Sequence, residues 1–206
     1  MSVYALDVTD VPAFAAAAQD FIQRHGVPDI VIANAGISAA TSCDLAADIA
    51  VLSTIMHTNV VGLAATLQAF AAPMRERGNG TLVGIASVAG FRGLAGAGAY
   101  SASKAAAIAW LEALRLELHD SGVDVLTICP GFIATPMTAR NRNPMPFLLQ
   151  APEAARRIAR AVGAKQRLAI IPWQMRLVFF FLRRMPNCLY DRLFAHAPRK
   201  GGDLPD

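Results

Sequence analysis

Cysteine is scarce in this chain, and nothing in its pattern would pair one cysteine with another. The 206 residues include Cys43, Cys129 and Cys188, which lie far apart and lack metal-ligand spacing. We therefore expect no metal site and no disulfide framework, as is typical of a reducing compartment. The first residues also lack a basic stretch followed by an apolar run and a small-residue cleavage site. A secretory signal is not expected, and the cytoplasm is the predicted location.

Acidic side chains are somewhat fewer than basic ones. The chain has 15 Asp and Glu against 19 Lys and Arg, for a net charge of +4, and 54% of its residues are hydrophobic. This length and composition predict one globular domain with a real core. No nucleic-acid motif accompanies the basic excess, so we do not expect nucleic acid as a partner. Ser87 also lacks the Gly-x-Ser-x-Gly elbow of a serine hydrolase.

Short apolar runs alternate with helical patterns along the chain. Buried strands are expected at residues 29–33, 80–86, 123–129 and 168–172. Helices are expected at residues 11–25, 44–77, 100–121 and 152–164. This order predicts an α/β fold with a parallel sheet.

Turn and polar residues follow three of the strand-like runs directly. They are Gly36, Ser87 and Pro130. In an open parallel sheet, ligands bind outside the carboxyl ends of the strands. We therefore expect these three residues to share one crevice. Each also has an ordinary interpretation, such as a turn residue or a helix cap.

Tyr100 and Lys104 are the most informative pair in the sequence. Residues four apart on a helix stand on one face, one turn from each other. A neighbouring ammonium favours the phenolate and so lowers the pKa of the phenol toward a value useful in acid-base catalysis. Taken alone, the pair is equally compatible with an ordinary amphipathic helix.

Further motifs stand around that pair in a fixed order. Asn34-Ala35-Gly36, Asn59, Ser87, Tyr100-x-x-x-Lys104 and Pro130-Gly131-x-Ile133-x-Thr135 follow one another along the chain. Together they resemble the short-chain dehydrogenase/reductase family, over about residues 2–172. The resemblance implies a Rossmann-like, doubly wound parallel sheet.

The resemblance also implies roles for four side chains. Tyr100 would exchange a proton with the substrate, and Lys104 would lower the pKa of Tyr100 and hold the nicotinamide ribose. Ser87 would hydrogen-bond the substrate oxygen. Asn59 would anchor a water that extends the proton relay. The implied reaction interconverts a secondary alcohol and a ketone by hydride transfer.

A nicotinamide cofactor, NAD or NADP, is implied because no side chain carries a hydride. Nothing in the sequence selects between the two forms. The residues expected to contact the cofactor are Asp7, Val8, Asn34, Ala35, Gly36, Tyr100, Lys104, Pro130, Gly131, Ile133 and Thr135.

The family's first two strands and its glycine-rich phosphate turn have no counterpart here. Residues 3–10 instead resemble the third strand, so the chain is expected to lack roughly the first fifty residues of the family. Strand 3–8 would then move beside the next strand, or another chain would cover the bared edge, or the fold would be poorly stable. We expect impaired cofactor binding in this form.

The resemblance to the family ends at about residue 172. Residues 173–206 are expected to form an apolar and basic helical tail that packs on the domain. Their apolar run is too short to cross a bilayer. The tail could instead line an apolar substrate pocket, or contact a membrane surface through residues 173–195. The resemblance also favours a homo-oligomer, and the apolar tail indicates a small apolar carbonyl or alcohol substrate.

Two functions from different classes are therefore open. The first is an oxidoreductase of the short-chain type. The second is a catalytically silent remnant that serves in binding or assembly, or that arises from a misplaced start.

Overall fold

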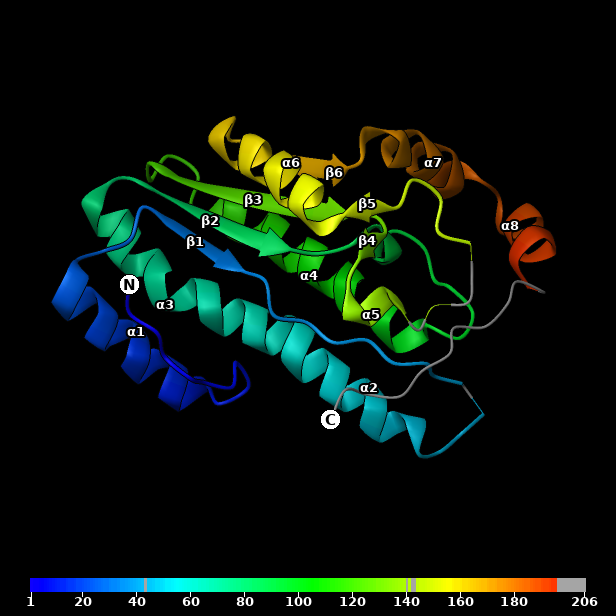
Figure 1. Ribbon diagram of the computed structural model, residues 1–206, viewed down its shortest axis with the longest axis horizontal. Helices are drawn as coiled ribbons and strands as arrows, with labels where there is room; N and C mark the ends of the chain where they lie inside the picture. The colour runs from blue at the N-terminus through cyan, green and yellow to red at the C-terminus, as the bar shows by residue number, and fades with distance from the viewer. Residues whose placement is uncertain (43, 140, 142–143, 196–206) are drawn as a thin grey trace.

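The core of the protein is a four-stranded parallel sheet in the order β1-β2-β3-β6 (Figure 1). The computed structural model describes residues 1–42, 44–139, 141 and 144–195. The strands are β1 (Ile30–Ala33), β2 (Gly80–Ile85), β3 (Val123–Pro130) and β6 (Leu168–Ile171). The four strands expected from the sequence between residues 29 and 172 are confirmed, and they run in the parallel arrangement of a Rossmann-like fold.

One predicted strand is wrong. Residues 3–8 are not in a strand and pair with none of the described ones. The segment instead lies along helix α1 (Val11–His25), where the Tyr4 hydroxyl donates to Asp20 Oδ2 at 2.6 Å. A strand is stable only where its backbone groups find partners, and side-chain contacts with α1 hold this segment away from the edge of β1.

One face of the sheet is covered by α3 (Leu63–Arg77) and α4 (Gly98–Glu117). α3 continues a helix that begins with α2 (Asp48–Met56) and passes through the π-helical turn η1 (His57–Gly62). By length and composition this continuous helix could span a membrane. We interpret it as a core helix, because the Leu67 and Met74 side chains are fully buried against the sheet.

The other face is covered by α6 (Ala151–Gly163), which packs on β3 and β6. Alternation along β3 explains the two cores: Val123 and Val125 face α3 and α4, whereas Leu126 and Ile128 face α6. After β3 come the short strands β4 (Ile133–Ala134) and β5 (Leu149–Gln150), with helix α5 (Pro136–Ala139) following β4.

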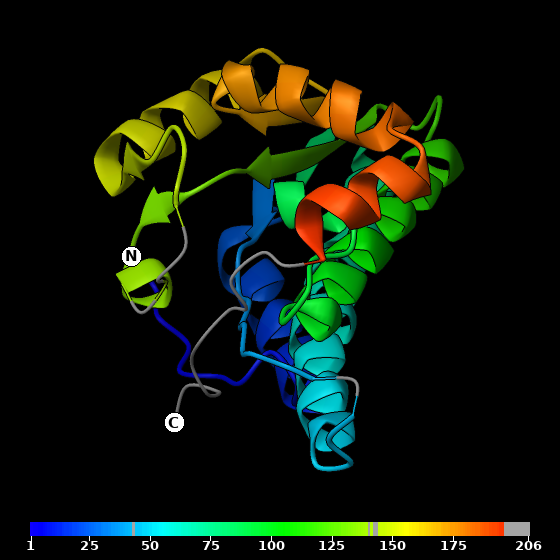
Figure 2. The same ribbon diagram turned by 90° about the vertical axis from the view of Figure 1, so that its right-hand side faces the viewer.

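Two helices close the carboxyl end of the sheet. They are α7 (Trp173–Arg184), which begins directly after β6, and α8 (Asn187–Phe194). In Figure 2, α7 (orange) runs across the top of the molecule, and α8 (orange-red) follows below it. Met175 and Phe179 of α7 form a small core with residues after β2, including Val88 of the 3-10 turn η2 (Val88–Gly90).

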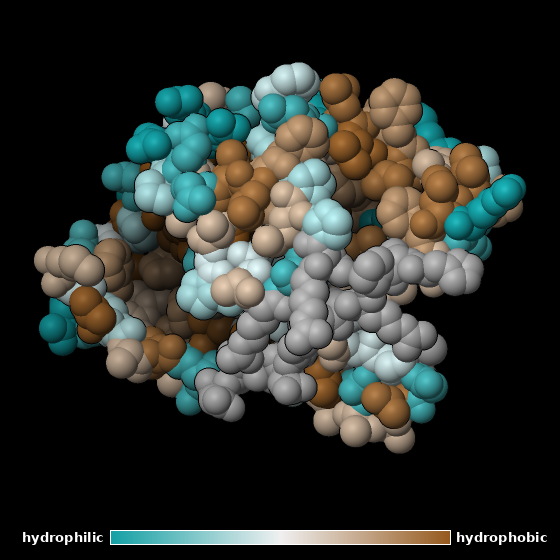
Figure 3. Space-filling view, turned by 45° about the vertical axis from the view of Figure 1, so that its right-hand side comes forward, coloured by the Kyte–Doolittle hydropathy of each residue, from teal (hydrophilic) through white to brown (hydrophobic). Residues whose placement is uncertain are grey.

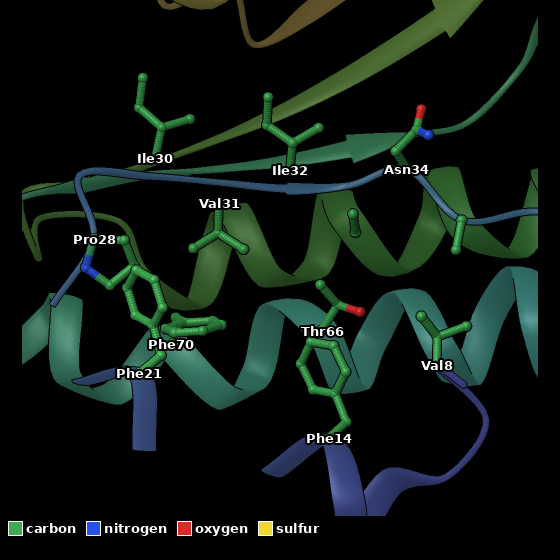
Figure 4. A pocket seen from close by; sticks show the side chains of 12 residues that line it. Val8, Phe14, Phe21, Pro28, Ile30, Val31, Ile32, Asn34, Thr66 and Phe70 are labelled. Atoms are coloured by element: carbon green, nitrogen blue, oxygen red, sulfur yellow. The ribbon is translucent and has the colours of Figure 1, made fainter. Parts of the chain in front are cut away.

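Strand β1 forms one edge of the sheet, and a groove of about 430 Å³ runs beside it (Figure 4). Val31 points toward α3, whereas Ile30 and Ile32 point to the opposite face. α6 does not cover that face as far as β1, so Ile30 and Ile32 are 50% and 48% exposed.

Candidate active site

A cavity of about 770 Å³ lies at the carboxyl ends of the parallel strands, where a Rossmann-like sheet places its ligands. The loops after β1, β2 and β3 and the first turns of α4 all contribute to its wall. Ten residues predicted from the sequence line this one cavity: Asn34, Ala35, Gly36, Ser87, Tyr100, Lys104, Pro130, Gly131, Ile133 and Thr135.

Ser87 and Tyr100 meet inside the cavity. Ser87 ends the loop after β2 and caps η2, accepting from the Ala89 N–H at 3.1 Å. Its side chain also forms a hydrogen bond with the Tyr100 hydroxyl. A carbonyl oxygen placed between these two hydroxyls would meet two donors. That arrangement is suited to holding and protonating a substrate oxygen.

Burial raises the pKa of Tyr100, and the hydrogen bond from Ser87 lowers it by less. The sequence-based expectation that Lys104 lowers this pKa is therefore wrong for the net shift. The reason is geometric. Lys104 Nζ lies 5.8 Å from the centre of the Tyr100 ring and is engaged with the backbone of β2, so the loss of hydration at the phenol dominates.

Lys104 is 4% exposed, and its ammonium donates to the Ile85 carbonyl at 2.9 Å. Burial lowers its pKa to about 8. The ammonium is thus held at the end of β2, one helical turn from Tyr100. Near pH 8 its charged and neutral forms have similar free energies, because burial disfavours the charge. A hydroxyl-bearing ligand in the cavity would find a donor here.

Asn59 stands behind the cavity wall and is fully buried. Its Oδ1 accepts from the Ile37 N–H at 2.8 Å, and its Nδ2 donates to the Ile37 carbonyl and to Ser103 Oγ, each at 2.9 Å. These bonds join η1 to the loop after β1 and to α4. Asn59 does not line the cavity among the described residues, so its contacts position the residues that do.

Gly36 lies directly against this network. A Cβ at position 36 would stand 3.2 Å from Asn59 Oδ1 and 3.4 Å from Lys104 Nζ. The first distance is tighter than most contacts of a Cβ atom, and the second is an ordinary van der Waals contact. Glycine therefore lets the loop after β1 approach Asn59 and Lys104 together.

The segment after β3 is anchored to β6. The Gly131 N–H donates to the Ile171 carbonyl at 2.7 Å. Beyond it, Ile133 lies in β4, and Thr135 Oγ1 donates to the Ile133 carbonyl at 3.4 Å. This segment forms the wall of the cavity opposite the loop after β1.

Asp7 and Val8 are not brought to the cavity. Asp7 Oδ1 accepts from both the N–H and the hydroxyl of Thr9 at 2.8 Å, and these bonds lower the pKa of Asp7. Val8 packs against Gly62 of η1 and lines the groove along β1. The two residues therefore lie apart from Tyr100 and Lys104.

From the sequence, an apolar substrate pocket lined by the carboxyl-terminal tail was one open alternative, but the residues that line it were not identified. Met175, Val178, Phe179 and Leu182 of α7 line the cavity. Their spacing of three and four residues is the signal of one helix face, and it would have found them. It could not have shown that the face meets the cavity.

Arg92 and Tyr190 were missed as well, and both line the cavity. The Arg92 guanidinium lies 4.1 Å from the centre of the Tyr190 ring and donates to Asn187 Oδ1 at 3.1 Å. The Tyr190 hydroxyl donates to the Gly93 carbonyl at 2.7 Å. These contacts tie α8 to the loop before α4.

Comparisons with known proteins agree with this geometry. Residues 1–146 match the short chain dehydrogenase family. An uncharacterized oxidoreductase of Myxococcus xanthus is 40% identical over 186 residues, which are 90% of this chain and 73% of that protein. The ketoacyl reductase HetN of Nostoc is 36% identical over 144 residues, 69% of this chain and 48% of the relative.

The fold is also that of solved family structures. A short chain dehydrogenase from Burkholderia cenocepacia, in complex with NADP, superposes with a TM-score of 0.80 at 26% identity. The match covers 93% of this chain and 80% of that one. The fold, the cavity at the strand ends and the family match over residues 1–146 agree, and the chain belongs to the short-chain dehydrogenase family of oxidoreductases.

Proposed function

We propose that this protein interconverts a ketone and a secondary alcohol with a nicotinamide cofactor. The observation that carries the proposal is the meeting of the Ser87 and Tyr100 hydroxyls in one cavity, with the Lys104 ammonium a helical turn away. The name of the Nostoc relative, a ketoacyl reductase, supports it, because a keto group is the oxidised partner of a secondary alcohol.

The residues present fit the nicotinamide end of such a cofactor. Gly36 leaves space beside the Lys104 ammonium that a Cβ would fill, and the cavity has room for a ring next to Tyr100. The residues that would hold this end are Tyr100, Lys104, Pro130, Gly131, Ile133 and Thr135. When bound, the cofactor supplies or accepts the hydride at the substrate carbon.

In this proposal, side chains of the protein bind the substrate oxygen and transfer the proton. In the reductive direction Ser87 donates a hydrogen bond to the ketone oxygen, and the Tyr100 hydroxyl gives its proton to that oxygen as the alcohol forms. Burial raises the pKa of Tyr100, so its hydroxyl is protonated at neutral pH before the reaction, while the same shift makes release of the proton less favourable. α7 and α8 contribute apolar and aromatic side chains to the wall of the cavity, among them Met175, Phe179 and Tyr190.

We propose in addition that these 206 residues alone bind the cofactor weakly. The glycine-rich turn that receives a dinucleotide pyrophosphate is absent from the sequence. Asp7 and Val8, two of the residues expected to contact the cofactor, lie outside the cavity. Titration calorimetry with NADP and NAD tests this, and tight binding of either cofactor would contradict it.

The alternative is a catalytically silent protein, and the same features favour it: the missing glycine-rich turn and the positions of Asp7 and Val8. A silent protein would keep the cavity but show no turnover at saturating cofactor. We also propose a homo-oligomer in the cytoplasm. The exposed apolar residues Ile49 on α2 and Leu116 on α4 support a contact between copies, and sedimentation velocity measures it.

Replacement of Tyr100 by Phe tests the reaction. We expect ketone reduction, followed by nicotinamide absorbance at saturating cofactor, to fall by about a hundredfold or more, because the proton donor is lost. The unfolding midpoint should change little. Tyr4→Phe is the matched control: its hydroxyl bonds Asp20 outside the cavity, and turnover should be unchanged. Undiminished turnover in Tyr100→Phe would contradict the assignment.

A further inference from the structure

Helix α7 is apolar on two opposite faces. Its inner face, with Met175, Val178, Phe179 and Leu182, lines the cavity. Its outer face carries bulky apolar side chains that stay in solvent: Trp173, Leu177, Phe180 and Phe181 are 65%, 53%, 51% and 66% exposed. Figure 3 shows apolar side chains gathered at the upper right, over the region of α7 and α8. Packing in the hydrophobic core does not explain why the side chains on this outer face are apolar.

The charges around this outer face have one sign. Arg176, Arg183 and Arg184 are exposed on α7, and residues 173–190 contain no Asp or Glu. Among the residues that the structure describes, none of these arginines forms an ion pair with an acid. The Arg184 guanidinium instead lies 3.7 Å from the centre of the Phe180 ring.

Helix α6 provides an internal contrast. Glu153 pairs with Arg156 at 2.9 Å and with Arg157 at 2.7 Å, whereas Arg160 forms no ion pair among the described residues. α6 is therefore also net basic, but two of its arginines share an acidic partner and no large apolar side chain of this helix is exposed. α7 presents aromatic and aliphatic side chains flanked by cations without acidic partners.

We propose that the outer face of α7 binds an anionic lipid surface. Exposed Trp, Phe and Leu on one side of a helix flanked by arginines are the features of a helix that lies in the membrane interface. Anionic headgroups would neutralise Arg176, Arg183 and Arg184 while the apolar face leaves water. A second copy of the same face would instead bring like charges together.

This position gives α7 a further role, which rests on the proposed function. The helix would separate the bilayer from the cavity by the width of one helix. The apolar lining of Val178, Phe179 and Leu182 then suits a carbonyl compound that is dissolved in the lipid. The substrate class is accordingly an apolar, membrane-partitioned ketone or alcohol.

Flotation with vesicles tests the surface. We expect the protein to bind vesicles of phosphatidylcholine with phosphatidylglycerol and to bind pure phosphatidylcholine at least about tenfold more weakly. Leu177→Gln with Phe181→Gln should lower binding to the anionic vesicles by about tenfold or more. Ile30→Gln with Leu168→Gln, which changes residues that are 50% and 52% exposed outside α7, is the matched control and should bind as the original protein does.

Trp173 reports the contact directly. In a Trp110→Phe background, its emission should shift to shorter wavelength when anionic vesicles are added. Circular dichroism checks that each variant is folded. Absence of vesicle binding by the original protein, or equal binding by the Leu177 and Phe181 variant, overturns the proposal. So does a dimer, seen by light scattering, that this variant abolishes. Tyr100→Phe should bind vesicles normally, so failure of the proposed reaction and failure of this surface are distinguishable.

Discussion

The cavity at the strand ends and the groove along β1 share Asn34 and Ala35 in their walls but are built in different ways. Around the cavity, buried polar groups are held by hydrogen bonds, as Asn59 and Lys104 are. Apart from Asn34 and Thr66, the groove is lined by apolar and aromatic side chains, and it contains no titratable group among its described residues. Side chains on the loops after the strands are available for chemistry. Side chains along the edge of the sheet serve mainly in packing.

Asn59→Leu should have the largest effect on this comparison. The change leaves the Ile37 backbone groups and the Ser103 hydroxyl without the partners they have now. We expect the free energy of unfolding to fall by about 4 kcal/mol, because unsatisfied buried polar groups cost about 1–3 kcal/mol each. Denaturant unfolding measures it. Asn79→Leu, at an exposed position, is the control, and an equally small change in both would contradict a cavity organised by hydrogen bonds.

Phe70→Ala examines the groove side in the same way. Phe70 is 9% exposed in the main core and meets Phe21 edge to face, with ring centres 6.4 Å apart. Its truncation should lower the free energy of unfolding by about 3 kcal/mol through lost burial and a cavity, without touching the bonds of Asn59. Phe181→Ala, at a 66% exposed position, should cost far less. Comparable losses at the two positions would mean that the groove wall is not packed as described.

The smallest expected effect is a pH dependence of the free energy of unfolding that comes from Lys104 in the cavity. Because the pKa of Lys104 is lowered to about 8 in the folded protein, the unfolded chain binds more protons above pH 8, and stability rises with pH there. We expect this group to add about 1 kcal/mol between pH 8 and 9. Burial raises the pKa of the nearby Cys129 thiol to about 12, which opposes the rise as pH approaches and passes 9.

Lys104→Met isolates that contribution, since Cys129 remains in the variant. The free energy of unfolding of the original protein, measured at pH 8 and pH 9, should increase relative to that of the variant. Parallel pH dependences for the two proteins would show that the ammonium is not held in a desolvated state.

Much of the fold was readable because its signals are local. Asp10 caps α1 by accepting from the Ala13 N–H at 3.1 Å, and Gly78 ends α3 with a φ of 77°. The start of α1 at Val11 and the end of α3 at Arg77 agree with the bounds expected from the sequence. The strand-like segment at residues 3–8 was not predictable in this way, because whether it forms a strand depends on a partner for its backbone.

The same distinction between local and long-range signals applies to the candidate site. Ser87, Tyr100 and Lys104 could be predicted because their order and spacing are written in the chain, and the structure brings them to one cavity. The raised pKa of Tyr100 could not be predicted, since the extent of burial depends on how α4 meets the loop after β2. The approach of α8 through Tyr190 and Gly93 joins residues nearly one hundred positions apart, and no spacing rule reaches so far.

The sequence by itself determined the helices, the four strands and the chemistry-bearing residues, because caps, periodicity and strand ends act over a few neighbouring residues. The tertiary structure alone decided that the Lys104 ammonium bonds the Ile85 carbonyl, that Gly36 lies against Asn59, and that α7 divides its apolar side chains between a cavity and solvent. These outcomes depend on distances between distant segments, which hydration and packing fix only when the whole chain has folded.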